Sequence, residues 1–486
     1  MSTLEPSWVD GWRVVRAAPL FMLVLVCSCA EDVGPTHPNV VLIIVDTLRA
    51  DRMAFNGCPQ STAPFLEDLA CRSLVFENAW SPSSWTLPAT VSILTSVHPF
   101  QHGVTNLAGL ELEPGEEPVP INCIPEELET LAESLRAAGY RTYGVVSNLL
   151  VGAEVGFDRG FDRFVQLQDE DADAVNGVVS DWHEEMLAQG PFFLYLHYID
   201  PHDTYHAREP WFDPARTSTE SGWSEEFREE AVDPDQIDWF MTRLDPKPDG
   251  LAHMTAREFS PADLRSFLAW SKAAYDSEIG FVDSRIRDIF EMLDLEDAIV
   301  VFLSDHGEEF YEHGHLTHGQ NIYGETMRVP LFLYMPQDDA RRGRVEAHVS
   351  TLDIAPTLRR LLGLPALGQD QGQDLLGDAT RQPVFGILAG KSGQHELEDD
   401  LRSIVLGDHR LIAQGDGSVE LYDLASDPLE RVDLAGEFPE VVAELLRALD
   451  EIERSAHVYP RATRLPSAPS EALLEHLRGI GYLGDE

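Results

Sequence analysis

Residues 39–49 read Asn39-Val-Val-Leu-Ile-Ile-Val45-Asp46-Thr47-Leu48-Arg49, in which six consecutive apolar side chains end directly at a carboxylate. Five of these six side chains are β-branched, which favours a strand over a helix. A run without polar alternation is typical of a strand covered on both faces, as in a parallel sheet that lies between helices. The stretch therefore predicts a central strand with a polar residue at its carboxyl end.

Three further runs of the same apolar character follow along the chain, at residues 141–147, 192–198 and 298–303. Helix-like stretches precede the first and the last of them, at 128–138 and 274–293. Buried strands that alternate with helices are the pattern of α/β proteins. We therefore predict a doubly wound, mostly parallel sheet flanked by helices over residues 38–340.

Two other regions complete the predicted organisation. Residues 205–262 are acidic, contain three Trp residues and lack a strand period, so we expect an insertion at the rim of the site. A solvated surface excursion explains them equally well. Residues 341–486 are expected to form a smaller C-terminal α+β subdomain. Within it, residues 410–423 predict a hairpin in a small antiparallel sheet, and residues 438–453 predict a helix.

The composition excludes some classes of protein. The chain has 486 residues with 35 Lys and Arg against 84 Asp and Glu, which gives a net charge of −49, and 43% of its residues are hydrophobic. This apolar content is sufficient for a large core, so a disordered chain is not expected. So negative a chain would be repelled by nucleic acid and by anionic lipid surfaces, and we expect neither as an electrostatic partner.

The amino-terminal sequence predicts export. The apolar run at 17–26 follows Arg13 and Arg16 and is too short to span a bilayer, which is typical of a signal peptide. The next residues, Val26-Cys-Ser-Cys29-Ala30, resemble a bacterial lipoprotein box. We expect a signal peptide over residues 1–28, lipidation of Cys29, and a location in the bacterial periplasm or cell envelope, with the membrane contacted only through the lipid. An ordinary secretory signal cut nearby is the alternative.

Three cysteines remain after Cys29, namely Cys58, Cys71 and Cys123. Export permits disulfides, and an odd number of thiols allows one intramolecular bridge at most. A bridge between Cys58 and Cys71 is consistent with the sequence, which does not establish it.

Clustered polar residues follow three of the predicted strands. Asp46 follows the first, Asp200-Pro201-His202 follows the third, and Ser304-Asp305-His306-Gly307-Glu308 follows the fourth. A single Asp after a strand is often only a helix cap. Ligands of open α/β sheets bind outside the carboxyl ends of the strands, and three such endings supply carboxylates and imidazoles to one edge. This set of side chains predicts a metal site.

A fourth segment contains a candidate nucleophile, Thr86, within Ser84-Trp85-Thr86-Leu87-Pro88. By itself this pattern is typical of a threonine that caps a helix. In the functional interpretation, the helix dipole and free amides at the helix start favour an oxyanion there. A divalent cation held by Asp46, Asp305 and His306 would lower the pKa of the Thr86 hydroxyl and activate it.

These motifs resemble the sulfatase family of the alkaline-phosphatase-like superfamily. The resemblance covers nearly the whole chain after the signal peptide, and it is carried by residues 41–51, 85–104, 194–202, 275–283, 304–333, 420–428 and 477–483.

The resemblance implies a role for each site residue. Asp46, Thr86, Asp305 and His306 fall on metal-ligand positions, so one divalent ion (Ca, Mg, Mn or Zn) is expected. Thr86 falls on the nucleophile position. His202 and His318 fall on family positions that would bind the substrate anion or protonate the leaving group. Arg410 lies near a basic position of the family that would contact the substrate.

The sequence departs from the family pattern at the nucleophile. Sulfatases carry Cys or Ser in a Cys-x-Pro-x-Arg signature and oxidise it to formylglycine, whereas this chain has Thr86 and, in place of the Arg, Thr90. The second Asp of the family's Asp-Asp pair is Thr47. We therefore expect a metal-dependent hydrolase of anionic sulfate or phosphate esters that uses Thr86 directly. Its substrate would be a small-molecule, glycan or lipid-derived ester. The alternatives are a phosphodiesterase or phospho-group transferase acting on lipid or glycan head groups, and a non-catalytic binding lipoprotein with the same fold.

Overall fold

The computed structural model describes residues 37–106, 121–217, 261–377, 383–389, 391–392, 395–396 and 400–464. The chain divides into two compact units, residues 1–36 and 37–486, and all described residues belong to the second. The predicted signal peptide (1–28), Cys29 and most of the predicted insertion therefore lie outside the described residues.

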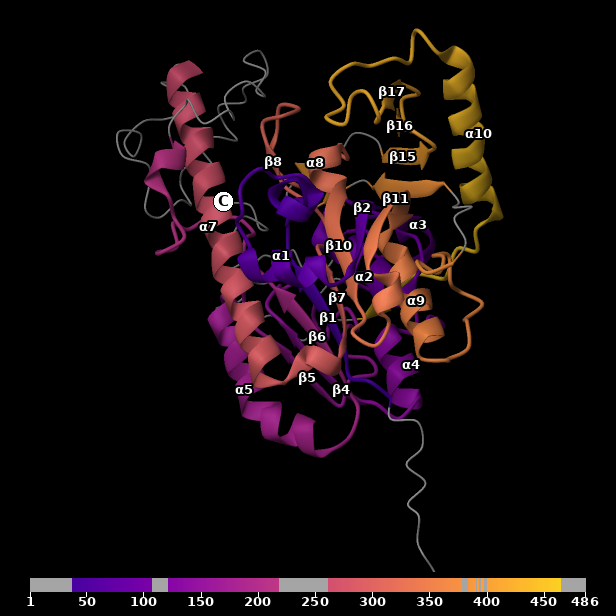
Figure 1. Cartoon of the computed structure of the whole chain (residues 1–486). Helices are drawn as coiled ribbons and strands as arrows, with labels where there is room; N and C mark the ends of the chain where they lie inside the picture. Colours follow the sequence, from indigo (N-terminus) through magenta and orange to yellow (C-terminus); the bar gives the residue numbers. More distant parts are fainter. Residues whose placement is uncertain are drawn as a thin grey trace, which may run out of the picture. The chain divides into compact units, whose positions relative to one another are not determined.

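A single large sheet forms the centre of the described unit (Figure 1). Its eight strands lie in the order β11-β2-β10-β7-β1-β6-β4-β5. Their bounds are β1 Val40–Val45, β2 Leu74–Trp80, β4 Arg141–Val146, β5 Arg163–Gln166, β6 Phe192–Tyr198, β7 Ile299–Leu303, β10 Arg328–Tyr334 and β11 Gly343–Ser350.

The predicted mostly parallel sheet is confirmed. All four predicted strands (β1, β4, β6 and β7) are present, and each pairs in parallel with its neighbours among them. Within this sheet only β10 runs antiparallel to the strands beside it. The chain between β7 and β10 contains one short helix, α8 (Gly324–Met327), and no long crossover helix of the kind that usually joins parallel strands.

The large sheet extends beyond the boundary predicted at residue 340. Strand β11 begins at Gly343 and pairs in parallel with β2 at the edge of the sheet. The sequence shows no buried apolar run here, because β11 is an edge strand that is largely exposed at its start.

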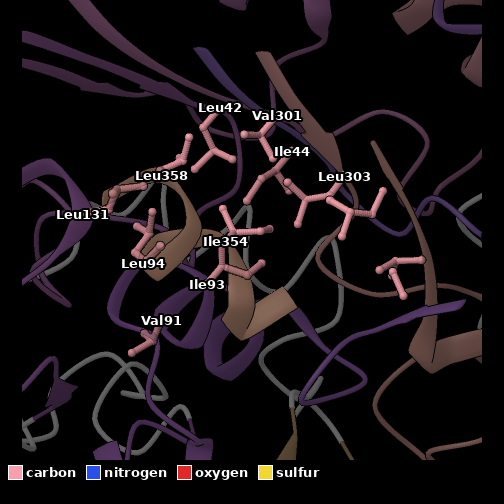
Figure 2. Close-up of a cluster of buried hydrophobic side chains, with 14 of the residues drawn as sticks. Leu42, Ile44, Val91, Ile93, Leu94, Leu131, Val301, Leu303, Ile354 and Leu358 are labelled. Carbon is pink, nitrogen blue, oxygen red and sulfur yellow. The ribbon is translucent and has the colours of Figure 1, made fainter. Parts of the chain in front are cut away.

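Successive side chains of a strand point to opposite faces of the sheet. Since the central strands are largely apolar, both faces are apolar, and helices cover both of them. On one face, Val41 and Ile43 of β1 join a core with α1 (Pro64–Cys71), α5 (Ala172–Ala188) and α7 (Pro261–Met292). The opposite face, shown in Figure 2, packs against α2 (Thr86–Thr95), α4 (Leu131–Ala137) and α9 (Ile354–Leu361). The predicted helices at 128–138 and 274–293 correspond to α4 and to part of α7.

The predicted C-terminal sheet is present. Its four antiparallel strands are β12 (Val384–Leu388), β15 (Leu401–Leu406), β16 (His409–Gln414) and β17 (Val419–Asp423), in that order. The last two form the predicted hairpin, and α10 (Pro439–Ser455) is the predicted helix. Apolar side chains of α10 and of this sheet form a third, smaller core.

Besides several 3-10 turns, the described residues include α3 (Pro99–His102) and three two-stranded pairs: β3 (Ile121–Cys123) with β18 (Ala462–Arg464), β8 (Glu309–Phe310) with β9 (Leu316–Thr317), and β13 (Lys391–Ser392) with β14 (His395–Glu396). Cys58, Cys71 and Cys123 are all free, so the bridge considered between the first two is not formed. Among the described residues, no helix has the length and apolar character needed to cross a membrane.

The central core makes a stability prediction. Leu42 is fully buried between β1 and α9 side chains, whereas Leu187 of α5 is 52% exposed. We expect Leu42→Ala to lower the free energy of unfolding by about 2–5 kcal/mol, because it removes buried methyl groups and leaves a cavity. Leu187→Ala, the matched control, should change it by less than about 0.5 kcal/mol. Denaturant titration of both variants measures this, and equal effects would contradict the assigned core.

Candidate active site

The carboxyl ends of the central parallel strands supply a cluster of buried polar side chains. Asp46 directly follows β1, Asn148 follows β4, and Asp305 and His306 follow β7. His197 is the second-last residue of β6. Parallel neighbours place these ends at one edge of the sheet, which explains how residues more than 250 positions apart come into contact.

Thr86 enters this cluster from helix α2. It is the first residue of the helix, Trp85 is the extended residue before it, and no side-chain capping bond is present. The simple capping interpretation of Thr86 is therefore wrong. Its hydroxyl instead lies 3.2 Å from Nε2 of His306 and 3.3 Å from Nδ2 of Asn148. All residues of α2 are buried, so the helix is held firmly by its surroundings, and the Thr86 hydroxyl at its start has a fixed position.

The four residues expected to hold a metal ion fit that role geometrically. Nε2 of His306 lies 3.2 Å from the Thr86 hydroxyl, 3.4 Å from Oδ1 of Asp46 and 3.6 Å from Oδ2 of Asp305. Neighbouring ligand atoms that share one ion with bonds of about 2.1 Å are separated by about 3.0–3.4 Å, which is similar to these spacings.

Unused lone pairs support the same assignment. Oδ1 of Asp46 and Oδ2 of Asp305 are buried and have no hydrogen-bond partner. His306 donates its Nδ1–H to the carbonyl of Gly307 at 2.9 Å, so Nε2 presents a lone pair to the cluster. Unpaired buried carboxylate oxygens are destabilising by themselves, and a cation between them satisfies all three groups.

The two carboxyl groups have opposite pKa shifts. Burial raises the pKa of Asp305 well above its usual value, and the charge of Asp46 raises it further. Burial acts on Asp46 in the same direction, but the hydrogen bond from His197 and the charges of nearby His residues hold the pKa of Asp46 below its usual value. Without a cation, the site therefore favours only one ionised carboxylate.

His202 and His318 form a second pair beside the cluster, with ring centroids 4.9 Å apart. The His202 ring donates from Nδ1 to the carbonyl of Asp203 at 2.7 Å, and its Nε2 is buried and unpartnered. The His318 ring donates from Nδ1 to Glu308 at 2.9 Å and lies 4.5 Å from the His306 ring. The sequence thus correctly grouped these two imidazoles with the carboxylates.

Their pKa values separate the two histidines. Burial lowers the pKa of His202, but the charges of Asp203, Asp46 and Glu308 outweigh it and raise the pKa to about 10. Burial and the charge of His202 lower the pKa of His318 to about 4. His202 is therefore the protonated partner at neutral pH, and His318 is the neutral one.

Arg410 is not brought into this cluster. It is fully buried in β16, pairs with Glu430 at 2.6 Å, donates to the carbonyl of Ile322, and lies over the Trp80 ring. None of these partners belongs to the cluster, so the geometry gives Arg410 a structural role and does not support the predicted substrate contact.

Sequence reasoning missed three members of the site: His197, Asn148 and Glu308. His197 is a lone imidazole inside the apolar run 192–198, and this polar interruption was a usable signal. Asn148 donates to Oδ2 of Asp46 at 2.7 Å, yet a single Asn after a strand is indistinguishable from a turn residue in sequence. Glu308 lies within the quoted Ser304–Glu308 stretch but received no role.

The fold and the site define a class of protein. A large mostly parallel sheet with carboxylates, imidazoles and a hydroxyl at its carboxyl edge is the alkaline-phosphatase-like arrangement, and the class is that of sulfuric and phosphoric ester hydrolases. The Sulfatase family model matches residues 38–364, and this chain belongs to the sulfatase family.

Similar proteins include both sulfatases and a phosphonate ester hydrolase. Human N-sulphoglucosamine sulphohydrolase is 25% identical and aligns with 74% of this chain and 69% of its own length. Human arylsulfatase A is also 25% identical, over 86% of this chain and 87% of its own length. The crystal structure of a phosphonate monoester hydrolase from Agrobacterium radiobacter has the same fold, with a TM-score of 0.66 and 19% identity over 86% of this chain and 96% of that one.

The unpaired carboxylates predict that a divalent cation stabilises the protein. At a cation concentration 100 times Kd, we expect chelator-treated protein to gain about 2.7 kcal/mol, measured as a rise in Tm. Asp305→Asn should lose most of this gain because it removes a buried ligand, whereas Asp181→Asn, on the exposed side of α5, should retain it. A Tm that does not respond to Mg²⁺, Ca²⁺, Mn²⁺ or Zn²⁺ would contradict the assignment.

Proposed function

We propose that this protein is a metal-dependent hydrolase that uses the Thr86 hydroxyl directly as its nucleophile and prefers phosphorus esters to sulfate esters. One observation carries the proposal: this hydroxyl lies 3.2 Å from the free lone pair of His306, at the start of a buried helix and beside two carboxylates with unpaired oxygens. A threonine without catalytic function would not require this combination.

The chemistry of threonine favours phosphorus over sulfur. The family mechanism uses formylglycine, whose hydrate releases sulfate by elimination and requires a second hydroxyl on the same carbon. Thr86 has one hydroxyl and cannot form such a hydrate, so a sulfated threonine would need water to attack sulfur. A phosphorylated threonine can be resolved by attack of water at phosphorus, which is the usual second step of covalent phosphoryl transfer.

Each residue of the site has its own role in the first displacement at phosphorus. Asp46, Thr86, Asp305 and His306 would hold the divalent cation, which acts as a Lewis acid and lowers the pKa of the hydroxyl. Thr86 loses its hydroxyl proton to solvent, and its Oγ1 attacks phosphorus as the P–O bond to the leaving group breaks. The amide groups at the start of α2 stabilise the developing anion. His202 gives its proton to the departing oxygen.

A second displacement then regenerates the enzyme. Water attacks the phosphorus, the bond between phosphorus and Oγ1 of Thr86 breaks, and Oγ1 takes back from solvent the proton that it lost in the first step. His202, now neutral, accepts the proton lost by the water, which restores its starting state. His318 remains neutral, and because its Nδ1–H is held by Glu308, its Nε2 presents a lone pair that can accept a hydrogen bond.

Three alternative functions use the same residues: a phospho-group transferase, a phosphodiesterase and a binding protein without catalysis. If an alcohol replaced water, the same residues would act as a phospho-group transferase, for example on lipid or glycan head groups. A phosphodiesterase would differ only in the substrate that it accepts. A binding protein without catalysis is disfavoured, because it would not need a nucleophile and four metal ligands with matched spacing.

A substrate panel tests the proposed function. We expect metal-loaded protein to hydrolyse an aryl phosphate, phosphodiester or phosphonate monoester faster than the matched aryl sulfate. Thr86→Ala should lower kcat by at least about 10³-fold, because it removes the nucleophile. Thr86→Ser, which keeps a hydroxyl, should retain most of this activity.

Two results would contradict the proposed function. The first is faster turnover of the sulfate than of every phosphorus ester. The second is full activity of Thr86→Ala on the best substrate. In quenched reactions, a phosphate adduct on the peptide that contains Thr86 should be detectable by mass spectrometry, with a radiolabel on phosphorus to distinguish it from sulfate.

We also propose that the protein is exported and anchored by a lipid on Cys29, in the bacterial periplasm or cell envelope. The support is the apolar run at 17–26 followed by the lipoprotein-like Val26–Ala30 stretch. Cys29→Ala should move the protein from the membrane fraction to the soluble fraction, while Cys58→Ala should not. An unchanged membrane association of Cys29→Ala would remove the anchor from the proposal.

A further inference from the structure

One imidazole in the cluster has no role in the reaction described above. His197 is fully buried, although the rest of β6 consists of apolar and aromatic side chains. Tyr195, two residues earlier on the same face of the strand, points toward α2 and its hydrophobic core. His197 therefore lies on the side of the sheet from which Thr86 enters the site.

The ring of His197 is held at both nitrogens. Nδ1 lies 2.9 Å from the hydroxyl of Tyr195, and Nε2 lies 3.2 Å from Oδ2 of Asp46 and 3.9 Å from Oδ2 of Asp305. Asp46, His197 and Asp305 present donor atoms that all lie within 4.8 Å of one another. These distances are similar to the spacing of donors that share one ion.

A purely hydrogen-bonding role explains His197 less well. Without a cation, Nε2–H of His197 donates to Oδ2 of Asp46 at 3.2 Å, although this oxygen already accepts a hydrogen bond from Asn148 at 2.7 Å. In the other tautomer, which a bound cation would favour, Nδ1–H donates to the phenol oxygen of Tyr195, and Nε2 presents a lone pair on the side of both carboxylates. Ligating histidines are commonly oriented in this way, by a partner on the opposite ring nitrogen.

We infer that His197 is a further nitrogen ligand of the cation held by Asp46, Thr86, Asp305 and His306, and that the site therefore selects Zn²⁺ over Ca²⁺ and Mg²⁺. This inference rests on the proposed metal site and goes further, because it names the ion that the donor set prefers. Tyr195 is a positioning residue that fixes the ring.

The chemistry of the donors carries the selectivity. Ca²⁺ takes six to eight oxygen ligands and Mg²⁺ requires oxygen ligands in an octahedron. Among the described residues, the cluster offers oxygen from only three side chains, Asp46, Asp305 and Thr86, together with two imidazoles. Imidazole suits Zn²⁺ and other first-row transition ions, whereas Ca²⁺ and Mg²⁺ gain little from it.

Metal binding to chelator-treated full-length protein tests the inference without an activity assay. We expect the wild type to bind Zn²⁺ at least about 10³-fold more tightly than Ca²⁺ in equilibrium dialysis with a competing chelator. His197→Asn should weaken Zn²⁺ binding by about 10- to 100-fold and change Ca²⁺ binding by less than about 3-fold. Tyr195→Phe should weaken Zn²⁺ binding in the same direction but to a smaller extent.

A matched control removes a buried imidazole elsewhere. His102 is also fully buried, but its ring lies against Ser92 and the backbone of Val104, outside the cluster. His102→Gln should leave the Zn²⁺ to Ca²⁺ affinity ratio unchanged. Thermal melts and near-ultraviolet circular dichroism of each variant establish that binding is compared between folded proteins.

X-ray absorption of the Zn²⁺-loaded wild type provides a test that needs no variant. We expect scattering from two imidazole rings, which are those of His197 and His306. One imidazole, or equal losses of Zn²⁺ and Ca²⁺ affinity in His197→Asn, would overturn the inference. Thr86→Ala should still bind Zn²⁺ through two imidazoles, so a failure of the proposed nucleophile and a failure of this ligand assignment give different results.

Discussion

The constraint on which the site depends is the burial of two carboxylates on neighbouring strands. Asp46 and Asp305 follow β1 and β7, are inaccessible to solvent, and each has an oxygen without a hydrogen-bond partner. Burial, together with the charge of Asp46, raises the pKa of Asp305, and a cation between the two groups would offset the repulsion and pair both oxygens. The folded protein thus contains a buried pair of carboxylates that a positive charge would stabilise.

The architecture of the sheet explains why the two buried carboxylates lie at the carboxyl ends of the strands. Both faces of the central strands are covered by helices, so polar side chains cannot leave the sheet through a face. The carboxyl ends of parallel strands are the remaining place for them, and β1, β6 and β7 end together there. Helix α2 directs its first residue at the same point, which brings a hydroxyl to the anion-binding end of a helix dipole.

The local arrangement also resolves the conflict between an acidic protein and an anionic substrate. The net charge of −49 repels anions at long range, but that field is screened within about 8–10 Å at physiological ionic strength. At the site itself, the start of α2 and the protonated ring of His202 favour negative charge, and the proposed cation would add to their effect. Capture of an anionic substrate would therefore depend on the charges within a few ångströms of the site, and it does not follow from the net charge of the chain.

The sequence by itself determined the class of fold and named most of the proposed ligand set. Unbroken apolar runs that end in Asp46 or in Asp305 and His306 are local signals, because a doubly covered strand needs continuous apolar side chains. The tertiary structure alone decided the antiparallel direction of β10, the burial of Arg410 against Glu430, and the entry of His197 and Asn148 into the site. These features depend on strand register and on which face a side chain takes. A shift of one residue reverses that face, and only contacts between distant segments fix it.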